Sequence, residues 1–351
     1  MSTVYAVVMA GGRGERFWPL STEQRPKPFV PLIGPATLLQ ETVARLRSLV
    51  PVERILIALG ENHRAIASRQ VPEIPPANFI VEPVGRDTAA CLGLSAIHLA
   101  QRDPQGIMLA LPADHFIDDP EQFRQTVRKG IENLEGSTGI VFGIRPDRPE
   151  TGYGYVRAEK PALPAAAWPV IRFVEKPDAA KAAEYVRSGR YFWNSGMFLW
   201  RNRTLLALFE AHMPEVSQAL NELRPLLARE DAQGEVTRIF SSLPRISIDY
   251  GILEKASGLR LVPVGFHWDD IGNWASLARA VPADSSGNIA QGPAVPVESS
   301  NCILRSDDGA VAVFGVSDLV VVRARGRILV CSRNRAADLK TLLSSLPEEM
   351  K

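Results

Sequence analysis

The first third of the chain alternates short apolar runs with stretches in which apolar side chains recur every third or fourth position. The runs predict buried strands at residues 4–9, 54–59, 78–82 and 106–111. The recurring positions predict helices at residues 37–50 and 88–102 and a third that begins near Pro120. Asp87 is the predicted cap of the second helix. This alternation predicts an α/β fold with a Rossmann-like, mixed but mainly parallel sheet and helices on both faces.

The pattern becomes more varied after residue 138. Strands are predicted at residues 139–143 and 170–174, a glycine-rich turn at 152–155, and helices at 179–188 and 203–229. Residues 282–292 resemble a linker, and short β-rich segments follow at 301–304, 310–314, 319–322 and 327–331, before a helix at 335–346. We therefore expect a large domain at residues 1–282 and a small domain at 283–351, built as a β-helix or sheet that serves packing or dimerisation.

A glycine-rich loop follows the first predicted strand, with glycines at Gly11, Gly12 and Gly14. Such loops bring backbone N–H groups close to a ligand, and phosphate oxygens suit them. Arg13, Arg16 and Lys27 add cations nearby, which predicts a polyphosphate site. Phe17 replaces the third glycine of a dinucleotide fingerprint, and no Gly-Lys-Ser/Thr follows as in a P-loop. A tight turn with exposed arginines is the structural alternative.

Composition limits the classes of protein that fit. The 351 residues are 46% hydrophobic and 23% charged, which allows a proper core, and the formal net charge of +1 gives no overall attraction to nucleic acid or membrane. The three cysteines are widely spaced and predict reduced thiols of a cytoplasmic protein. No signal-peptide pattern or membrane-length apolar run is present.

Acidic residues follow the strand at 106–111 and recur near residue 270. Asp114 can hold a hard cation such as Mg²⁺, which needs only one or two carboxylates in addition to substrate phosphates; a turn or helix cap is its structural alternative. Asp269 and Asp270 are neighbours in a segment that we expect to be extended, so only one of them can share a metal with Asp114. Zinc at His115 and His267 is the weaker interpretation, because no close His/Cys spacing supports it.

Three later segments carry polar groups suited to a sugar phosphate. Glu175 and Lys176 follow a predicted strand and can contact hydroxyls and a phosphate, or form an exposed ion pair. Residues 192–198 combine aromatic side chains with Asn194, as a sugar site or a core strand does. Residues 247–255 resemble an N-capped helix that brings Asp249, Glu254 and Lys255 to the same side.

Several motifs together resemble the sugar-nucleotide pyrophosphorylases over residues 1–280. These are Gly11-Gly-Arg-Gly-Glu-Arg16 with Pro26-Lys-Pro28, Leu111-Pro-Ala-Asp-His115, Val174-Glu-Lys-Pro177, Trp193-Asn-Ser-Gly196 and Trp268-Asp-Asp-Ile-Gly272. The resemblance implies a nucleotidyltransferase domain, followed by a left-handed β-helix-like domain. It also implies transfer of GMP from GTP to α-D-mannose 1-phosphate, forming GDP-mannose and pyrophosphate, with Mg²⁺ as cofactor and no nucleic-acid or membrane partner. A homodimer stays open.

The resemblance assigns roles to matching positions. Arg16 and Lys27 would bind the triphosphate, Lys176 the attacking sugar phosphate, and Asp114 with Asp270 the Mg²⁺. The glycine loop with Arg13 would bind the nucleotide. The mannose would be held by Gly154, Glu175 and Asn194.

Guanine recognition is expected at residues 82–88, which match the family signature Glu-Pro-x-x-Arg-Asp/Asn-Thr-Ala. Glu82 has the acceptors for the N1–H and amino group of guanine, a donor pair that adenine lacks. Arg86, Asp87 and Thr88 complete the motif. Glu15 departs from the wider family, where threonine is common, and its carboxylate must turn away from a triphosphate, pair with Arg13 or meet the metal. The sequence ends before any isomerase-like segment, so a bifunctional form is not expected.

Three alternatives stay open. The same chemistry can serve another hexose 1-phosphate or another nucleotide. A non-catalytic sensor of nucleotide sugars would lack phosphate or metal residues, yet Arg16, Lys27, Asp114, Lys176 and Asp270 are all present. A dinucleotide oxidoreductase is disfavoured by Phe17.

Overall fold

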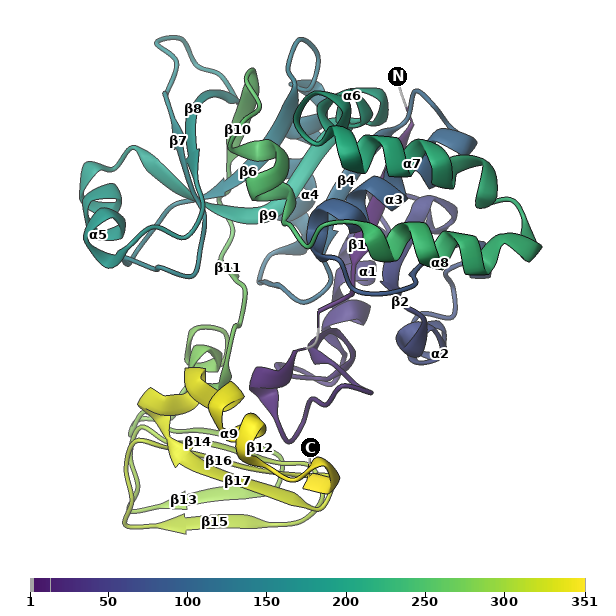
Figure 1. Cartoon of the computed structure of the whole chain (residues 1–351). Helices are drawn as coiled ribbons and strands as arrows, with labels where there is room; N and C mark the ends of the chain where they lie inside the picture. The colour runs from purple at the N-terminus through teal and green to yellow at the C-terminus, as the bar shows by residue number, and fades with distance from the viewer. Residues whose placement is uncertain (1–2, 13, 351) are drawn as a thin grey trace. The chain divides into compact units, whose positions relative to one another are not determined.

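The computed structural model describes residues 3–12 and 14–350, apart from the side chain of residue 230. The chain divides into two compact units (Figure 1). The first comprises the residues up to Gly11, Thr42–Ala113 and Ile117–Trp268. The second comprises Gly12–Glu41, Asp114–Phe116 and the residues from Asp269 onward. This division follows packing, and the expected functional boundary at residues 282/283 stays a prediction.

A nine-stranded mixed sheet forms the centre of the first unit, counted over the described residues, in the order β3-β2-β1-β4-β9-β6-β10-β8-β7. Its strands are β1 Val4–Met9, β2 Ile55–Gly60, β3 Phe79–Glu82, β4 Ile107–Pro112, β6 Gly139–Ile144, β7 Tyr155–Ala158, β8 Trp168–Val174, β9 Tyr191–Arg201 and β10 Leu259–Pro263. Strands β1 to β4 pair in parallel, as do β6 and β10, whereas β9 runs antiparallel to β4, β6 and β7. The short strands β5 Phe116–Ile117 and β11 Trp268–Asp269 pair with each other.

Helices cover both faces of this sheet, as the alternation predicts. They are α1 Leu38–Leu46, α2 Glu61–Gln70, α3 Asp87–Arg102, α4 Pro120–Glu132, α5 Ala179–Ser188, α6 Asn202–His212, α7 Pro214–Leu226 and α8 Gln233–Ser242. Side chains alternate along β9: Phe198 belongs to the core shared with α3, α6 and α7, while Leu199 faces Gly130 of α4 on the other side. Figure 1 shows α3, α6, α7 and α8 grouped together. The predicted α/β fold class is confirmed.

Several predictions in this unit need correction. The helix expected at residues 203–229 is two helices. Pro214 has no backbone N–H to continue the hydrogen bonds of α6, and it occupies the first position of α7. Residues 247–255 contain only a short π-helix, η6 Asp249–Leu253, and the Ser247 hydroxyl accepts a hydrogen bond of 3.4 Å from the Tyr250 N–H at its start, as the predicted cap does. The helix α8 was not expected. Residues 192–198 are part of the central strand β9, with Phe192 and Trp193 in the core, as the core-strand alternative expects, and a sugar contact at Asn194 stays a prediction.

The second unit contains a β-helix-like fold near its C-terminus. Strands β12 Ile289–Gln291, β14 Ile303–Ser306 and β16 Leu319–Ala324 stack in parallel, as do β13 Ala294–Val297 and β15 Val311–Phe314. The register places Ile289, Ile303 and Val320 above one another in a buried core. β17 Arg327–Ser332 closes the stack antiparallel to β16. The linker expected at 282–292 therefore already contains β12.

Short helical segments complete the second unit. The helix expected at residues 335–346 is a 3₁₀ segment, η8 Arg333–Asp338, followed by α9 Leu339–Ser345. The glycine loop leads into η1 Glu15–Phe17, and η2 Lys27–Phe29 and η7 Trp274–Arg279 lie in the same unit. Phe17, Trp274 and Leu339 share one core with the β-helix, so η1, η7 and α9 pack as one body.

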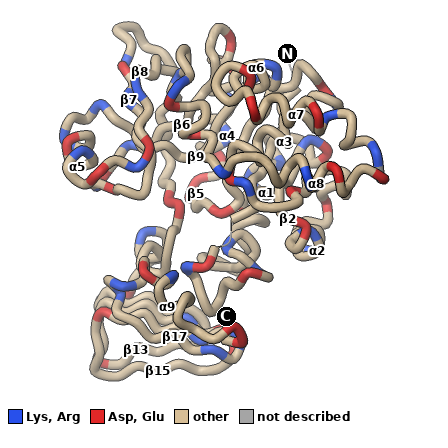
Figure 2. The backbone as a smooth tube through the Cα atoms, viewed as in Figure 1, with Lys and Arg blue, Asp and Glu red and all other residues tan. Residues whose placement is uncertain are grey.

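Charged residues of both signs are interspersed along both units (Figure 2). The three cysteines are free, and Cys91 and Cys302 are buried. Across the described residues, we find no helix with the length and apolar character that a membrane span requires.

Candidate active site

The glycine loop is shaped by one left-handed residue, Gly14, with φ of 59°. A Cβ on Gly14 would lie 2.4 Å from the backbone nitrogen of Lys27, so only glycine fits here. Its carbonyl accepts a hydrogen bond of 2.5 Å from the Ser21 hydroxyl. Gly12 is exposed and has open space around it. The predicted nucleotide residue Arg13 lies outside the described residues.

Lys27 forms a nearly buried ion pair with Asp114. Its Nζ donates to Oδ2 of Asp114 at 2.9 Å and also to the backbone carbonyl of Asp270. Lys27 is 6% exposed. Burial by itself would raise the pKa of Asp114, but the charges of Lys27 and His115 outweigh that effect and hold the pKa below its usual value. Asp114 is therefore a carboxylate at neutral pH.

The neighbouring acids Asp269 and Asp270 have different surroundings. Asp269 is 1% exposed, pairs with Arg279 and accepts a hydrogen bond of 2.8 Å from the Ile271 N–H. Asp270 instead lines a cavity together with Asp114. Its carboxylate lies beside Gly272, where an added Cβ would be 3.3 Å from Oδ2 of Asp270. Of the two acids, Asp270 lines the cavity together with Asp114, and Asp269 does not.

That cavity, which we call the Lys27 pocket, has a volume of about 420 Å³ and lies within the second unit. It is lined by Gly12, Gly14, Glu15, Arg16, Phe17, Lys27, Asp114, His115, Asp270, Gly272 and Lys340. Arg16 approaches Asp270 there, since its Nη1 would lie 3.5 Å from a Cβ on Gly272. Four residues from separate motifs, Arg16, Lys27, Asp114 and Asp270, thus meet at one cavity. A dense set of cations and carboxylates of this kind suits a polyphosphate with a divalent ion.

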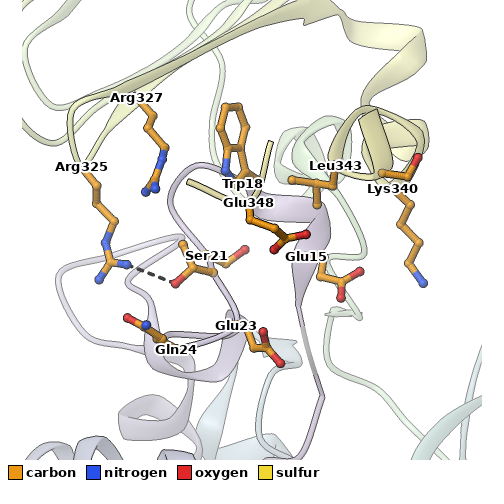
Figure 3. Close-up of a pocket in the computed structure, with 12 residues that line it drawn as sticks. Glu15, Trp18, Ser21, Glu23, Gln24, Arg325, Arg327, Lys340, Leu343 and Glu348 are labelled. Carbon is orange, nitrogen blue, oxygen red and sulfur yellow. Dashed lines mark hydrogen bonds between the residues drawn. The ribbon is translucent and has the colours of Figure 1, made fainter. Parts of the chain in front are cut away.

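A second cavity of about 550 Å³ in the same unit, which we call the Trp18 pocket, shares Glu15 and Lys340 with the Lys27 pocket (Figure 3). Arg325 and Arg327 reach it from the end of the β-helix, and Arg325 donates to the Thr22 hydroxyl at 3.2 Å. No predicted motif includes Lys340. The one signal in the sequence is that Lys340 follows an apolar residue in a predicted helix, which indicates a surface position and no particular role.

In the first unit, Glu82 is the buried acid of the motif at 82–88. It ends β3 opposite Gly60, is 5% exposed, and its Oε2 would be 3.0 Å from a Cβ on Gly11. Burial raises the pKa of Glu82 to about 7; a hydrogen bond from Cys91 lowers it and the charge of Asp87 raises it further. The predicted base acceptor therefore titrates near neutral pH.

The other residues of this motif make internal hydrogen bonds. Arg86 donates to the carbonyl of Ser241. Asp87 has a left-handed backbone, with φ of 66°, and its carboxylate accepts a hydrogen bond of 2.7 Å from the Thr88 N–H. The Thr88 hydroxyl accepts one of 2.9 Å from the Ile248 N–H. In this structure these bonds connect α3 to α8 and η6, and direct nucleotide contact by Arg86, Asp87 and Thr88 stays a prediction.

The three predicted sugar residues meet in the first unit. A Cβ on Gly154 would lie 2.4 Å from Oε2 of Glu175 and 3.2 Å from Cβ of Asn194, so a larger residue here would displace the Glu175 carboxylate. The Asn194 side chain donates to Asp249 at 2.8 Å. Glu254 accepts a hydrogen bond of 2.9 Å from the Glu175 N–H. We call these five residues the Gly154 cluster.

Lys176 lies next to this cluster with its backbone in the left-handed region, φ 46°. Its Nζ is 2.8 Å from Oε1 of Glu175. Burial would lower the pKa of Lys176, but the hydrogen bond and charge of Glu175, with Tyr250 and Asp249, raise it, so the ammonium is charged. Burial also raises the pKa of Asp249 to about 7, and the charge of Glu175 adds to this shift. Asp249 is thus a titrating acid beside the predicted sugar residues.

Comparison with known proteins supports one family. The family model for nucleotidyl transferases matches residues 5–287, and a MannoseP isomerase/GMP-like beta-helix domain matches residues 292–346. A mannose-1-phosphate guanylyltransferase from Escherichia coli strain K12 is 36% identical over 98% of this chain and 74% of its own length. The chain belongs to the nucleotidyl transferase family, in the group of the mannose-1-phosphate guanylyltransferases.

Two further proteins show a similar likeness to this chain. The alginate biosynthesis protein AlgA of Pseudomonas aeruginosa is 36% identical over 97% of this chain and 71% of its own length. A crystal structure from Thermus thermophilus, described as a mannose-1-phosphate geranyltransferase, has a TM-score of 0.88 and 39% identity, and the match covers 97% of this chain and 98% of that one. The predicted resemblance and the two-part fold are therefore confirmed.

The chemistry of the Lys27 pocket fits a hard divalent cation. Asp114 and Asp270 offer carboxylate oxygens at one cavity. Among the described residues, no group of three or more His, Cys, Asp or Glu side chains is placed to hold a metal ion by itself. Two carboxylates suffice for Mg²⁺ when substrate phosphates and water supply its other ligands.

Proposed function

We propose that this nucleotidyltransferase transfers GMP from GTP to α-D-mannose 1-phosphate, releasing pyrophosphate and forming GDP-mannose. The observation that carries the proposal is the Lys27 pocket, where Arg16, Lys27, Asp114 and Asp270 line one cavity in a chain of the guanylyltransferase family. A phosphate oxygen of the sugar phosphate attacks the α-phosphorus of GTP, the new P–O bond forms, and the bond to pyrophosphate breaks. No general base is required, because the attacking phosphate is ionised at pH 7.

The glycine loop and its cations act on the triphosphate. Arg16 binds the β- and γ-phosphates, where negative charge grows as pyrophosphate leaves. The Lys27 ammonium is engaged by Asp114 and the Asp270 carbonyl, so its role is to keep both acids in position as well as to add positive charge. Gly11, Gly12 and Gly14 let the backbone approach the phosphates without side-chain interference.

Asp114 and Asp270 are the proposed ligands for Mg²⁺. When bound, the ion supplies positive charge that lowers the repulsion between the two anionic substrates. The depressed pKa of Asp114 keeps this ligand ionised over the whole physiological pH range.

The Gly154 cluster is the proposed mannose site. Glu175 and Asn194 offer acceptors and a donor for sugar hydroxyls, and the absent side chain at Gly154 makes room for the Glu175 carboxylate. The Oε2 of Glu175 is buried and has no hydrogen-bond partner among the described residues. A buried acceptor of this kind is stabilised by a ligand hydroxyl. Lys176 neutralises the sugar phosphate.

Glu82 is the proposed guanine-binding residue. It can accept from N1–H and the amino group of guanine only as a carboxylate, and its pKa of about 7 makes that recognition pH-dependent. Adenine has an acceptor at N1, which a carboxylate repels.

A pyrophosphate-release assay with a panel of substrates tests the proposal. GTP, ATP, UTP and dTTP are each combined with mannose 1-phosphate, glucose 1-phosphate and galactose 1-phosphate in the presence of Mg²⁺. We expect the highest kcat/KM for GTP with mannose 1-phosphate, and a loss of rate on chelation that Mg²⁺ restores. A higher kcat/KM for another pair would reassign the substrates. No release with any pair, despite GDP-mannose binding, would identify a sensor.

A further inference from the structure

Lys340 is a cation of the Lys27 pocket that comes from the C-terminal part of the chain. It follows Leu339 in α9, and Leu339 is 3% exposed in the core shared with the β-helix. The next residue of a helix points about 100° away from its neighbour, so anchoring Leu339 presents Lys340 to the surface. Lys340 is exposed and reaches from α9 on the same side as Glu15 (Figure 3). The core therefore fixes the helix that positions this lysine.

The cations of this pocket differ in what they already bind. Lys27 is engaged by Asp114 and the Asp270 carbonyl. Arg16 and Lys340 have neither a hydrogen bond nor an ion pair among the described residues that line the pocket. These two side chains can therefore bind a phosphate without first breaking a contact within the protein.

The charges of the residues that line the pocket are a second reason to expect that Lys340 binds phosphate. The described lining contains three lysine or arginine side chains, Arg16, Lys27 and Lys340, together with the imidazole of His115. It also contains three carboxylates, those of Glu15, Asp114 and Asp270. Without Lys340, two permanent cations would face three carboxylates, which weakens the attraction of this lining for a triphosphate or pyrophosphate. Apart from Arg16 and Lys27, the predicted motifs add only the imidazole of His115 as a basic group in the described lining.

We propose that Lys340 binds the terminal phosphates of the nucleotide and the pyrophosphate that leaves, so that the β-helix domain contributes a substrate-binding residue. This inference rests on the proposed function of the Lys27 pocket. It gives the small domain a role in the reaction beyond packing or dimerisation. Lys340 acts through a charge-assisted hydrogen bond to phosphate, so it affects the nucleotide and pyrophosphate and not the sugar.

Binding of inorganic pyrophosphate, measured by calorimetry with Mg²⁺, tests this role without turnover. We expect Lys340→Met to raise the pyrophosphate Kd about tenfold, as loss of one charged hydrogen bond does. Lys340→Arg should stay within about threefold of the wild type, because it keeps the charge. The matched control is Arg335→Ala, which removes an exposed cation that pairs with Asp338 in the preceding η8 segment. It should leave the Kd unchanged.

Steady-state kinetics separate binding from a structural effect. Lys340→Met should raise KM for GTP about tenfold and leave KM for mannose 1-phosphate unchanged. Equal increases in both KM values with a lower Tm would show a structural role and overturn the inference. A pyrophosphate Kd equal to that of the wild type would also overturn it.

The two proposals fail in different ways. If the wild type releases no pyrophosphate from any nucleotide, the proposed function is wrong, whatever Lys340 does. If the wild type is active and Lys340→Met behaves like Arg335→Ala, only the role of Lys340 is wrong.

Discussion

The ammonium of Lys27 lies 2.9 Å from the carboxylate of Asp114, two residues separated by 87 positions in the chain. The Asp114 side chain is 28% exposed and the Lys27 side chain only 8%. A pair of this kind leaves an uncompensated charge when one partner is removed, and that charge is costly where water is scarce. Replacing either residue should therefore change both the stability of this part of the fold and the activity that we propose for the pocket.

Lys27→Met should cost about 2 kcal/mol of unfolding free energy, less than for a fully buried pair because Asp114 is partly exposed. It should also lower kcat/KM by a factor on the order of 100. Denaturant unfolding and pyrophosphate release measure the two effects. The double variant Lys27→Met/Asp114→Asn removes both charges and should regain stability but not activity. Unchanged stability of Lys27→Met would mean that the pair does not form in solution.

Gly14→Ala should destabilise the protein by about 1–3 kcal/mol, since alanine at φ of 59° is strained and its Cβ would overlap the Lys27 backbone. Gly12→Ala is the matched control, because a Cβ there meets nothing within 4 Å. It should change stability by less than about 0.5 kcal/mol. Thermal unfolding of both variants checks the contrast, and equal Tm values would contradict the described loop.

Most of the central sheet could be predicted from the sequence, because strands buried on both faces consist of continuous apolar runs. The break at Pro214 was missed because apolar spacing continues on either side of it. Strand β13, Ala294–Val297, was missed because only some of its apolar residues are buried and because it contains a proline, which is uncommon within a strand.

The candidate site was predictable where side-chain chemistry stands next to a strand end. Asp114 follows β4 and lines the same cavity as Gly12. Glu82 ends β3 and lies beside Gly11. The family resemblance named Asp270 rather than Asp269, and the structure supplies a physical reason, because Arg279, ten residues further along the chain, pairs with Asp269. Lys340 was not predictable, since its place depends on the packing of α9 and not on a local motif.

Lys176→Ala should raise KM for mannose 1-phosphate by a factor on the order of 10–100 and leave KM for GTP within about twofold. The reason is that Lys176 carries a full charge beside the proposed sugar residues. Lys181→Ala is the control, because Lys181 is an exposed lysine of α5 paired with Asp178. Asp114→Asn, by contrast, should raise the requirement for both substrates and for Mg²⁺. Similar mild effects of Lys176→Ala and Asp114→Asn on the two substrates would refute these assignments.

Asp249 should make the protein less stable as pH rises from about 4 to about 7. Its pKa is raised from 3.8 to about 7 in the folded state by burial first and the charge of Glu175 second, so the folded protein holds a proton that the unfolded chain has released. Asp249→Asn retains an acceptor for the Asn194 amide and should flatten this decline. Unfolding free energies across that pH range provide the measurement, and the same slope in both proteins would exclude Asp249 as its source.

Glu82 should make GTP binding stronger as pH rises through about 7. Its pKa is about 7 in the folded protein, so below that pH the protonated acid has lost an acceptor for guanine. Glu82→Gln should weaken GTP binding at pH 8 by about tenfold or more and bring the affinity close to that of the wild type at pH 6. The phosphates of GTP also titrate in this range, so the pH profile of Glu82→Gln serves as the reference for their effect.

Calorimetric titration of the wild type and Glu82→Gln with GTP and with ATP at pH 6, 7 and 8 makes this test. ATP is the control ligand, because it carries the same triphosphate but lacks the N1–H and amino donors of guanine. If the wild type and Glu82→Gln show parallel profiles for GTP, guanine is recognised by another group. If the profiles diverge for GTP and coincide for ATP, the carboxylate of Glu82 recognises the base.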